Sequence, residues 1–183
     1  MHRQLADLES EVAELKNVHE LLRESEERFR GAFDHAAIGM AIVSPEGRWL
    51  QVNRSLCAIV GYPEKELLHL TFQDVTHPED LDKDLNYVRQ MLSGRIQSYD
   101  MEKRYFRKDG HTVWVLLSVS LVHNRDGAPL YFVAQIQDIS ARKLAQAARD
   151  SLIDQLQEAL AGCGKTACSS GFESFSSVAV TPC

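Results

Sequence analysis

Residues 99–139 read YDMEKRYFRKDGHTVWVLLSVSLVHNRDGAPLYFVAQIQDI, which is three strand-like runs joined by two tight turns. The turns contain Asp109-Gly110 and Asp126-Gly127, and Asp-Gly pairs are typical of β-hairpins because they accept positive backbone φ angles. The expected strands are 99–107, 111–123 and 130–139. Two consecutive hairpins of this kind predict an antiparallel sheet.

The side chains of these strands indicate how the sheet is covered. Strand 130–139 alternates apolar and polar residues, so that one of its faces belongs to the core. Strand 111–123 is apolar on both faces, because the alternate residues from Val113 to Leu121 form one apolar face while Trp114 and Leu116 make the other face apolar too. Such a strand is typical of a sheet covered on both sides. We expect the helices of the domain on one face and an element from outside it on the other.

The residues before these strands predict two more strands and several helices. Strands are expected at 37–44 and 48–53, and short helices at 54–60 and 63–68. A longer helix begins after His77-Pro78 and ends at Gly94, with proline and acidic residues in its first turn and glycine beyond its end. Its apolar stripe is Leu81, Leu85, Val88 and Leu92. An antiparallel sheet with helices on one face is an α+β fold.

A long helix is expected before this domain, over residues 1–32. Nine of its positions follow alternating steps of three and four residues, and seven of the nine are apolar. The seam is Leu5, Leu8, Val12, Leu15, His19, Leu22, Glu26, Phe29 and Phe33. This spacing predicts a coiled coil that pairs two parallel copies of the chain in a homodimer. The alternative is a single amphipathic helix that lies on its own domain.

The C-terminal part of the chain predicts a second helix and a tail. The helix is expected over 141–161, with leucines at helical spacing from Leu144 to Leu160 and an end at Gly162. Residues 162–183 are small and polar, and we expect them to be disordered. The chain thus divides into a helix at 1–32, a domain at 33–140, a linker helix at 141–161 and a tail.

Composition excludes several classes of partner. The net charge of −6 and the pI of about 5.6 give no basic surface for nucleic acid. No apolar run approaches the roughly 20 residues that a membrane-spanning helix needs. The first 20 residues carry charges throughout, which is unlike a signal peptide. We expect a cytoplasmic protein that binds neither nucleic acid nor membrane.

Five motifs, taken in order, resemble the PAS domain family together with the C-terminal half known as PAC. They are Glu27-Arg28-Phe29-Arg30 with Phe33; Asn53, Cys57 and Gly61-Tyr62; FQDVTHPED at 72–80; Lys103-Arg104-Tyr105 with Lys108-Asp109-Gly110; and Asp138-Ile139-Ser140 with Arg142. The resemblance implies a five-stranded antiparallel sheet cupped by helices, with a cavity between them. The candidate lining of that cavity is Ile38, Met40, Ile42, Asn53, Leu85, Val88, Val115 and Leu117.

The resemblance also implies a function. PAS domains are input modules of sensor kinases, cyclic-dinucleotide enzymes and related regulators. The chain is then expected to receive a signal and pass it through its flanking helices, in a homodimer, to an effector such as a histidine kinase or a cyclic-dinucleotide enzyme. A ligand-free structural dimerisation module is the alternative.

The cofactors of the family are judged from the residues that would hold them. Photoactive flavin relatives need a cysteine beyond the short helices, but residues 67–80 contain none and Cys57 lies on the first short helix. Haem-binding relatives take a histidine from the long helix, and residues 79–93 contain none. His77 lies just before that helix, where capping is the alternative role. The amides available for a non-covalent flavin are Asn53, Gln73 and Gln135.

We expect no cofactor; haem and non-covalent flavin remain the open alternatives. The seven histidines are scattered, with no pair four residues apart and no cysteine at ligand spacing, so no metal site is predicted. A kinase, cyclase or phosphodiesterase domain would need well over a hundred further residues. The sequence therefore predicts a module without catalytic residues of its own.

Overall fold

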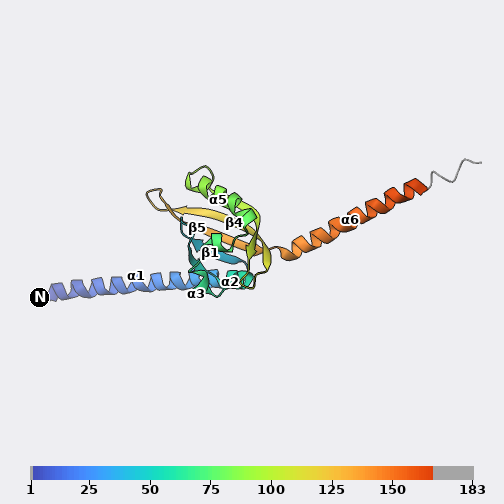
Figure 1. Ribbon diagram of the computed structural model, residues 1–183. Helices are drawn as coiled ribbons and strands as arrows, with labels where there is room; N and C mark the ends of the chain where they lie inside the picture. Colours follow the sequence, from blue (N-terminus) through green and yellow to red (C-terminus); the bar gives the residue numbers. More distant parts are fainter. Residues whose placement is uncertain (1, 167–183) are drawn as a thin grey trace, which may run out of the picture. The chain divides into compact units, whose positions relative to one another are not determined.

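The computed structural model describes the backbone of residues 2–166 and the side chains of residues 11–160 (Figure 1). The chain divides into two compact units, residues 1–140 and 141–183. The first unit holds a long helix and the domain, and the second holds the C-terminal helix. Each unit is described by itself.

The domain is built on a five-stranded antiparallel sheet, as the sequence predicts. Its strands are β1 (Gly39–Val43), β2 (Trp49–Val52), β3 (Ser98–Phe106), β4 (Thr112–His123) and β5 (Pro129–Asp138). They lie in the order β2-β1-β5-β4-β3. The two Asp-Gly hairpins connect β3 to β4 and β4 to β5, and the pairing of β1 with β5 joins the two halves of the sheet.

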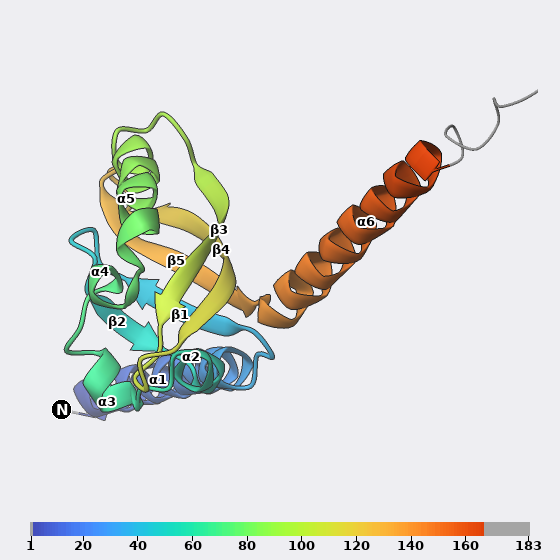
Figure 2. The same ribbon diagram turned by 45° about the vertical axis from the view of Figure 1, so that its right-hand side comes forward.

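Four helices pack on one face of this sheet (Figure 2). They are α2 (Arg54–Val60), α3 (Glu64–Leu67), α4 (Phe72–Val75) and α5 (Pro78–Leu92). Helix α4 is a single turn that periodicity could not predict. It is held by a capping box in which Asp74 accepts hydrogen bonds from the backbone N–H and the hydroxyl of Thr71, each at 2.7 Å.

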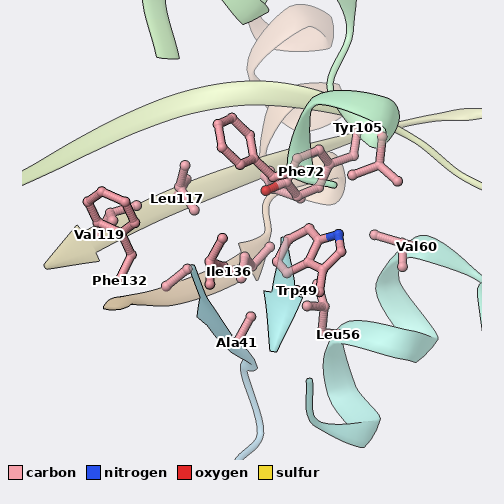
Figure 3. Close-up of a cluster of buried hydrophobic side chains, with 14 of the residues drawn as sticks. Ala41, Trp49, Leu56, Val60, Phe72, Tyr105, Leu117, Val119, Phe132 and Ile136 are labelled. Carbon is pink, nitrogen blue, oxygen red and sulfur yellow. The ribbon is translucent and has the colours of Figure 1, made fainter. Parts of the chain in front are cut away.

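The core lies between the sheet and these helices. Figure 3 shows the rings of Trp49, Phe72 and Tyr105 gathered among aliphatic side chains such as Leu117 and Ile136. All five of these residues are buried. Burial of apolar surface of this kind is the main stabilising contribution to the fold.

Strand β1 comes so close to helix α2 that a side chain at Gly39 would be crowded by backbone atoms. A Cβ atom at Gly39 would lie 3.0 Å from the carbonyl oxygen of Ile136 and 3.2 Å from the Cα of Leu56. Both neighbours are backbone atoms, which cannot move aside cheaply. Gly39, Ala41 and Val43 face the core, whereas Met40 and Ile42 face the other side of the sheet.

Helix α1 (His2–Asp34) continues past Gly31 and ends two residues beyond the predicted boundary. Phe33, at its end, is 3% exposed and belongs to the domain core. The other described seam residues, from Val12 to Phe29, are exposed. The amphipathic stripe of α1 thus does not lie on its own domain.

Helix α6 (Ser140–Thr166) is longer than predicted, because it does not end at Gly162. A glycine inside a helix costs only about 1 kcal/mol relative to alanine, so it permits a helix end without imposing one. The first five residues of the predicted tail are helical. The rest of that tail, residues 167–183, lies outside the described residues.

The close contact at Gly39 gives a stability prediction. Gly39→Ala is expected to lower the free energy of unfolding by about 1–3 kcal/mol, because the new methyl group overlaps backbone atoms of two elements. Urea denaturation measures this loss. The control is Gly31→Ala, where an added Cβ meets nothing within 4 Å and no loss is expected. Equal losses in the two variants would contradict the close approach of β1 and α2.

Candidate functional site

A cavity of about 30 Å³ lies between the sheet and helices α4 and α5. That volume accommodates one or two water molecules. Most of its wall is apolar or aromatic: Val43, Trp49, Phe72, Val88, Tyr105, Leu117, Val119, Phe132 and Ala134. The remaining lining residues are Tyr99, Lys103 and Asp84, which form a polar cluster at one side.

The structure brings together some of the residues predicted to line the cavity. Val88 and Leu117 are part of its wall. Val115 lies on the same sheet face, fully buried, and Leu85 packs half-buried against the core, but neither contacts the cavity.

The prediction was wrong for Met40 and Ile42, which point to the opposite face of the sheet. Their size suggested core positions, whereas the inner face of β1 carries Gly39, Ala41 and Val43, with Gly39 at the close approach to α2. Ile38 precedes β1 and does not line the cavity either. Its carbonyl oxygen accepts a hydrogen bond from Asn53 instead.

Lys103 and Asp84 form a buried ion pair at the polar side of the cavity. Lys103 projects inward from β3, Asp84 projects from α5, and each side chain is 1% exposed. The Lys103 ammonium donates to the Asp84 carboxylate and to the Thr76 hydroxyl, the latter at 3.2 Å. It also lies 4.5 Å from the centre of the Tyr105 ring. These contacts compensate the loss of water around a buried cation.

The Asp84 carboxylate has a second donor on β3. The Tyr99 hydroxyl donates to the other carboxylate oxygen at 2.6 Å. Burial, and then the negative charge of Asp84, raise the pKa of Tyr99 far above its usual range. Tyr99 therefore remains a protonated donor at any physiological pH.

Sequence reasoning missed this pair, although the sequence carries a signal for it. Lys103 stands in the inward alternation of β3 between Met101 and Tyr105, where a lysine must be buried. Asp84 stands three residues after Leu81, on the apolar stripe of α5. A basic and an acidic residue at two core positions predict a buried ion pair, because an isolated buried charge is too costly.

The next residue of β3 holds the start of α5 from the outside. Arg104 contacts Asp80 through its backbone N–H at 2.8 Å, through Nε at 2.9 Å and through Nη2 at 2.9 Å. The guanidinium lies 5.2 Å from the ring centre of Trp114. Its hydrogen bonds lower the pKa of Asp80. Two consecutive basic residues of β3 thus form ion pairs with two acidic residues that lie one turn apart on α5.

Asn53 fastens the end of helix α1 to the domain and does not line the cavity. Its Nδ2 donates to the carbonyl oxygens of Phe33 and Ile38, both at 2.9 Å. Its Oδ1 accepts from the backbone N–H groups of Met40 and Leu56, both at 2.9 Å. One buried amide therefore joins α1, β1 and the start of α2.

The end of the domain is fastened to β4 at Trp114. The Trp114 carbonyl oxygen accepts from the backbone N–H of Ile139 at 2.9 Å, and the backbone N–H of Trp114 donates to the Ser140 hydroxyl at 3.1 Å. Asp138 accepts from the backbone N–H of Ser140 at 2.8 Å. The motif Asp138-Ile139-Ser140 thus connects the first residue of α6 to the sheet.

The family's cofactors do not fit this arrangement. A flavin or haem needs a pocket of several hundred Å³, whereas the rings of Trp49, Phe72 and Tyr105 occupy the space beside the cavity. His77 caps α5, because its Nδ1 accepts from the backbone N–H of Glu79 at 3.3 Å. Among the side chains that the structure describes, those of residues 11–160, no three potential metal ligands gather into a site.

Cys57 lies half-buried on α2. Burial, and then the nearby charge of Glu64, raise the pKa of its thiol. Because the thiolate is the reactive form, this shift makes Cys57 a poor nucleophile.

Comparison with known proteins shows the family. A family model described as the PAS fold matches residues 27–139, and the chain belongs to this family of sensory domains. The crystal structure of the PAS domain of an HTR-like protein from Haloarcula marismortui is 26% identical with a TM-score of 0.56, covering 68% of this chain and 99% of that one. A sensory box histidine kinase/response regulator from Burkholderia thailandensis is also 26% identical, with a TM-score of 0.56 and coverage of 72% and 98%.

Two curated relatives are much longer proteins. The probable diguanylate cyclase DgcE of Escherichia coli is 50% identical over 135 residues, which cover 74% of this chain and 12% of DgcE. The sensor histidine kinase TmoS of Ectopseudomonas mendocina is 28% identical over 186 residues, which cover 96% of this chain and 19% of TmoS. This chain thus spans less than a fifth of either relative. Among the described helices, none is long and apolar enough to span a bilayer.

The buried ion pair gives a prediction for stability. Lys103→Met leaves the Asp84 charge unpaired, and it is expected to lower the free energy of unfolding by about 3–5 kcal/mol. Combining Lys103→Met with Asp84→Leu removes both charges and is expected to recover most of that loss. Guanidinium denaturation of the three proteins measures both effects. A double variant less stable than Lys103→Met alone would contradict the pairing.

The Asp80 contact gives a prediction for pH. The pKa of Asp80 is lower in the folded than in the unfolded chain, so its stabilisation is present above the unfolded value of about 3.9. It is lost as pH falls through the folded value. Asp80→Asn is therefore expected to be less stable than the wild type at pH 7, with a difference that shrinks in acid. The control is Asp82→Asn, at an exposed site of the same helix, and a similar pH profile for both variants would refute the assignment.

Proposed function

We propose that this chain is a sensory module that receives a signal in its cavity and passes it through α1 and α6, in a homodimer, to an effector outside the chain. The observation that carries the proposal is the position of the two helix attachments. Gly39 at the start of β1 pairs with Ile136 near the end of β5. The end of α1 and the start of α6 therefore meet the sheet at the same end.

The contacts provide a route from the cavity to the C-terminal helix. Leu117 and Val119 of β4 line the cavity, and Trp114 of the same strand holds Ser140, the first residue of α6. A shift of β4 against its neighbours would move the start of that helix. This supports the cavity as the input and α6 as the output of the proposed module.

The homodimer is proposed from the exposed faces of both helices. In α1, seam residues such as Leu15 and Leu22 are 64% and 57% exposed, and in α6 Leu144 and Leu160 are 72% and 75% exposed. Apolar stripes at coiled-coil spacing are buried when a second copy pairs with them. Trp114 and Leu116, half-buried on the outer sheet face, offer a surface on which the partner's helix could pack.

The relatives indicate which effector to expect. DgcE is named a probable diguanylate cyclase and TmoS a sensor histidine kinase. An effector of one of these two kinds, acted on in the cytoplasm, is part of the proposal. No catalytic role is assigned to residues 1–183.

A ligand-free dimerisation module is the second candidate, because the cavity is small. A volume of about 30 Å³ is far below that of ordinary ligand pockets. In that case the flanking helices would transmit a change that arises outside the chain.

Insertions that rotate the later part of α6 test whether a signal passes through this helix. In a fusion of residues 1–161 to a diguanylate cyclase domain, inserting seven residues after Ala148 keeps the leucine stripe in register, whereas inserting five rotates it by roughly 140° to another face. We expect the seven-residue insertion to retain the cyclase activity of the fusion and the five-residue insertion to change it several-fold. Equal activities would refute transmission through α6.

The seam of α1 gives a prediction for dimerisation. Glu26 occupies a seam position where, in a parallel dimer, it faces its own copy. Glu26→Leu is expected to tighten the dimer by on the order of 1–2 kcal/mol, because it adds apolar contact and removes the repulsion of like charges. Sedimentation equilibrium at pH 7 measures the change. The control is Glu24→Leu, two positions away and outside the seam, and equal effects of the two substitutions would show that the register is wrong.

A further inference from the structure

The polar side of the cavity has the form of a carboxylate-binding site. Both donors to the Asp84 carboxylate come from β3, where Lys103 and Tyr99 are four residues apart on the same face of the sheet. Each donor contacts a different carboxylate oxygen. Both donor side chains therefore belong to the sheet. The carboxylate that they bind, that of Asp84, belongs to α5.

We propose that Lys103 and Tyr99 form a receptor for small monocarboxylates, which Asp84 occupies in this structure and which a solute carboxylate enters in its place. The proposal rests on the sensory function proposed above and gives the chemical class of its ligand. No covalent step is involved, because one carboxylate replaces another.

The positive charge of Lys103 determines that the ligand is a monocarboxylate. The Lys103 ammonium is 1% exposed, and its single anionic contact among the described residues is Asp84. When Asp84 leaves, the cation needs another counter-charge, because an unpaired buried charge is very unfavourable. One negative charge balances it, whereas a dianion would leave a buried excess. A neutral ligand would leave the ammonium unpaired.

The walls determine the shape of the ligand. Acetate reproduces the end of the Asp84 side chain, so it fits the space that Asp84 vacates. The adjoining cavity of about 30 Å³ is lined by Val88, Leu117, Val119 and Phe132. A short apolar tail, as in propionate, would fill this space and gain apolar contact that Asp84 does not make.

Exchange of the carboxylate changes the attachment of α5. Asp84 then has to reach water, so α5 must turn or move away from β3 at that residue. The first turn of α5 stays fastened by Asp80 and Arg104, outside the cavity. The movement is therefore expected in the later turns, from Asp84 to Leu92.

The first test is chemical rescue of Asp84→Ala in the full chain. This variant empties the receptor and leaves Lys103 without its counter-ion. Sodium acetate and sodium propionate are expected to raise its thermal unfolding midpoint by several degrees in a saturable way, relative to sodium chloride at equal ionic strength. Propionamide, the neutral analogue, is expected to have no such effect. A folded Asp84→Ala variant on which the carboxylates act no differently from chloride would overturn the receptor.

Two matched variants separate the receptor from general effects of salt. Asp84→Asn keeps an amide in the place of the carboxylate and leaves no room for a solute, so no rescue is expected. Asp80→Ala removes a carboxylate from the same helix outside the cavity, and no rescue is expected there either. Rescue of Asp80→Ala as large as that of Asp84→Ala would overturn the assignment to Lys103 and Tyr99.

The second test uses the wild-type chain, so it tests the exchange of Asp84 for a solute carboxylate even if Asp84→Ala does not fold. Titration with propionate is expected to shift the backbone amide NMR signals of residues 84–92 in a saturable way, and Lys103→Met is expected to abolish these shifts. Absence of saturable shifts in the wild type would overturn the exchange. If the shifts occur but propionate leaves the activity of a cyclase fusion unchanged, the receptor stands and the proposed sensory function fails.

Discussion

A lysine on β3 and an aspartate on α5 face each other in the interior, where each side chain is 1% exposed. Neither can be buried without the other, since an unpaired charge in this position would cost several kcal/mol. The pair therefore fixes where α5 lies against the sheet, and Tyr99 and Thr76 complete its hydrogen bonds. The adjacent contact of Arg104 with Asp80 fixes the start of the same helix from the outer side.

The two flanking helices are attached to the domain by hydrogen bonds at single residues. The Nδ2 of Asn53 donates to Phe33 at the end of α1, while its Oδ1 accepts from the backbone N–H of Leu56 in α2. Trp114 holds Ser140, the first residue of α6, through its backbone N–H. Both attachments are directional hydrogen bonds in a partly or fully buried setting, where a lost bond is expensive.

The sheet, its strand boundaries and the family were predictable from the sequence, because alternation, Asp-Gly turns and the proline at the first position of α5 are local signals. The lining of the cavity was only partly predictable. Met40 and Ile42 were misplaced because the face of β1 is decided by the approach of α2 at Gly39, a contact between distant residues. Lys103 and Asp84 each carry a local signal, a charge at a core position, but the contact between them depends on β3 and α5 coming together. The end of α6 was misplaced because glycine allows a helix to end without forcing it.

Native-state hydrogen exchange tests most directly whether the buried pair fastens α5 to the sheet. In Lys103→Met, the amides of residues 84–92 are expected to lose at least tenfold more protection than the amides of β5, because α5 can then open while the sheet stays folded. Equal loss of protection in α5 and β5, or unchanged protection in α5, would contradict the role given to Lys103 and Asp84.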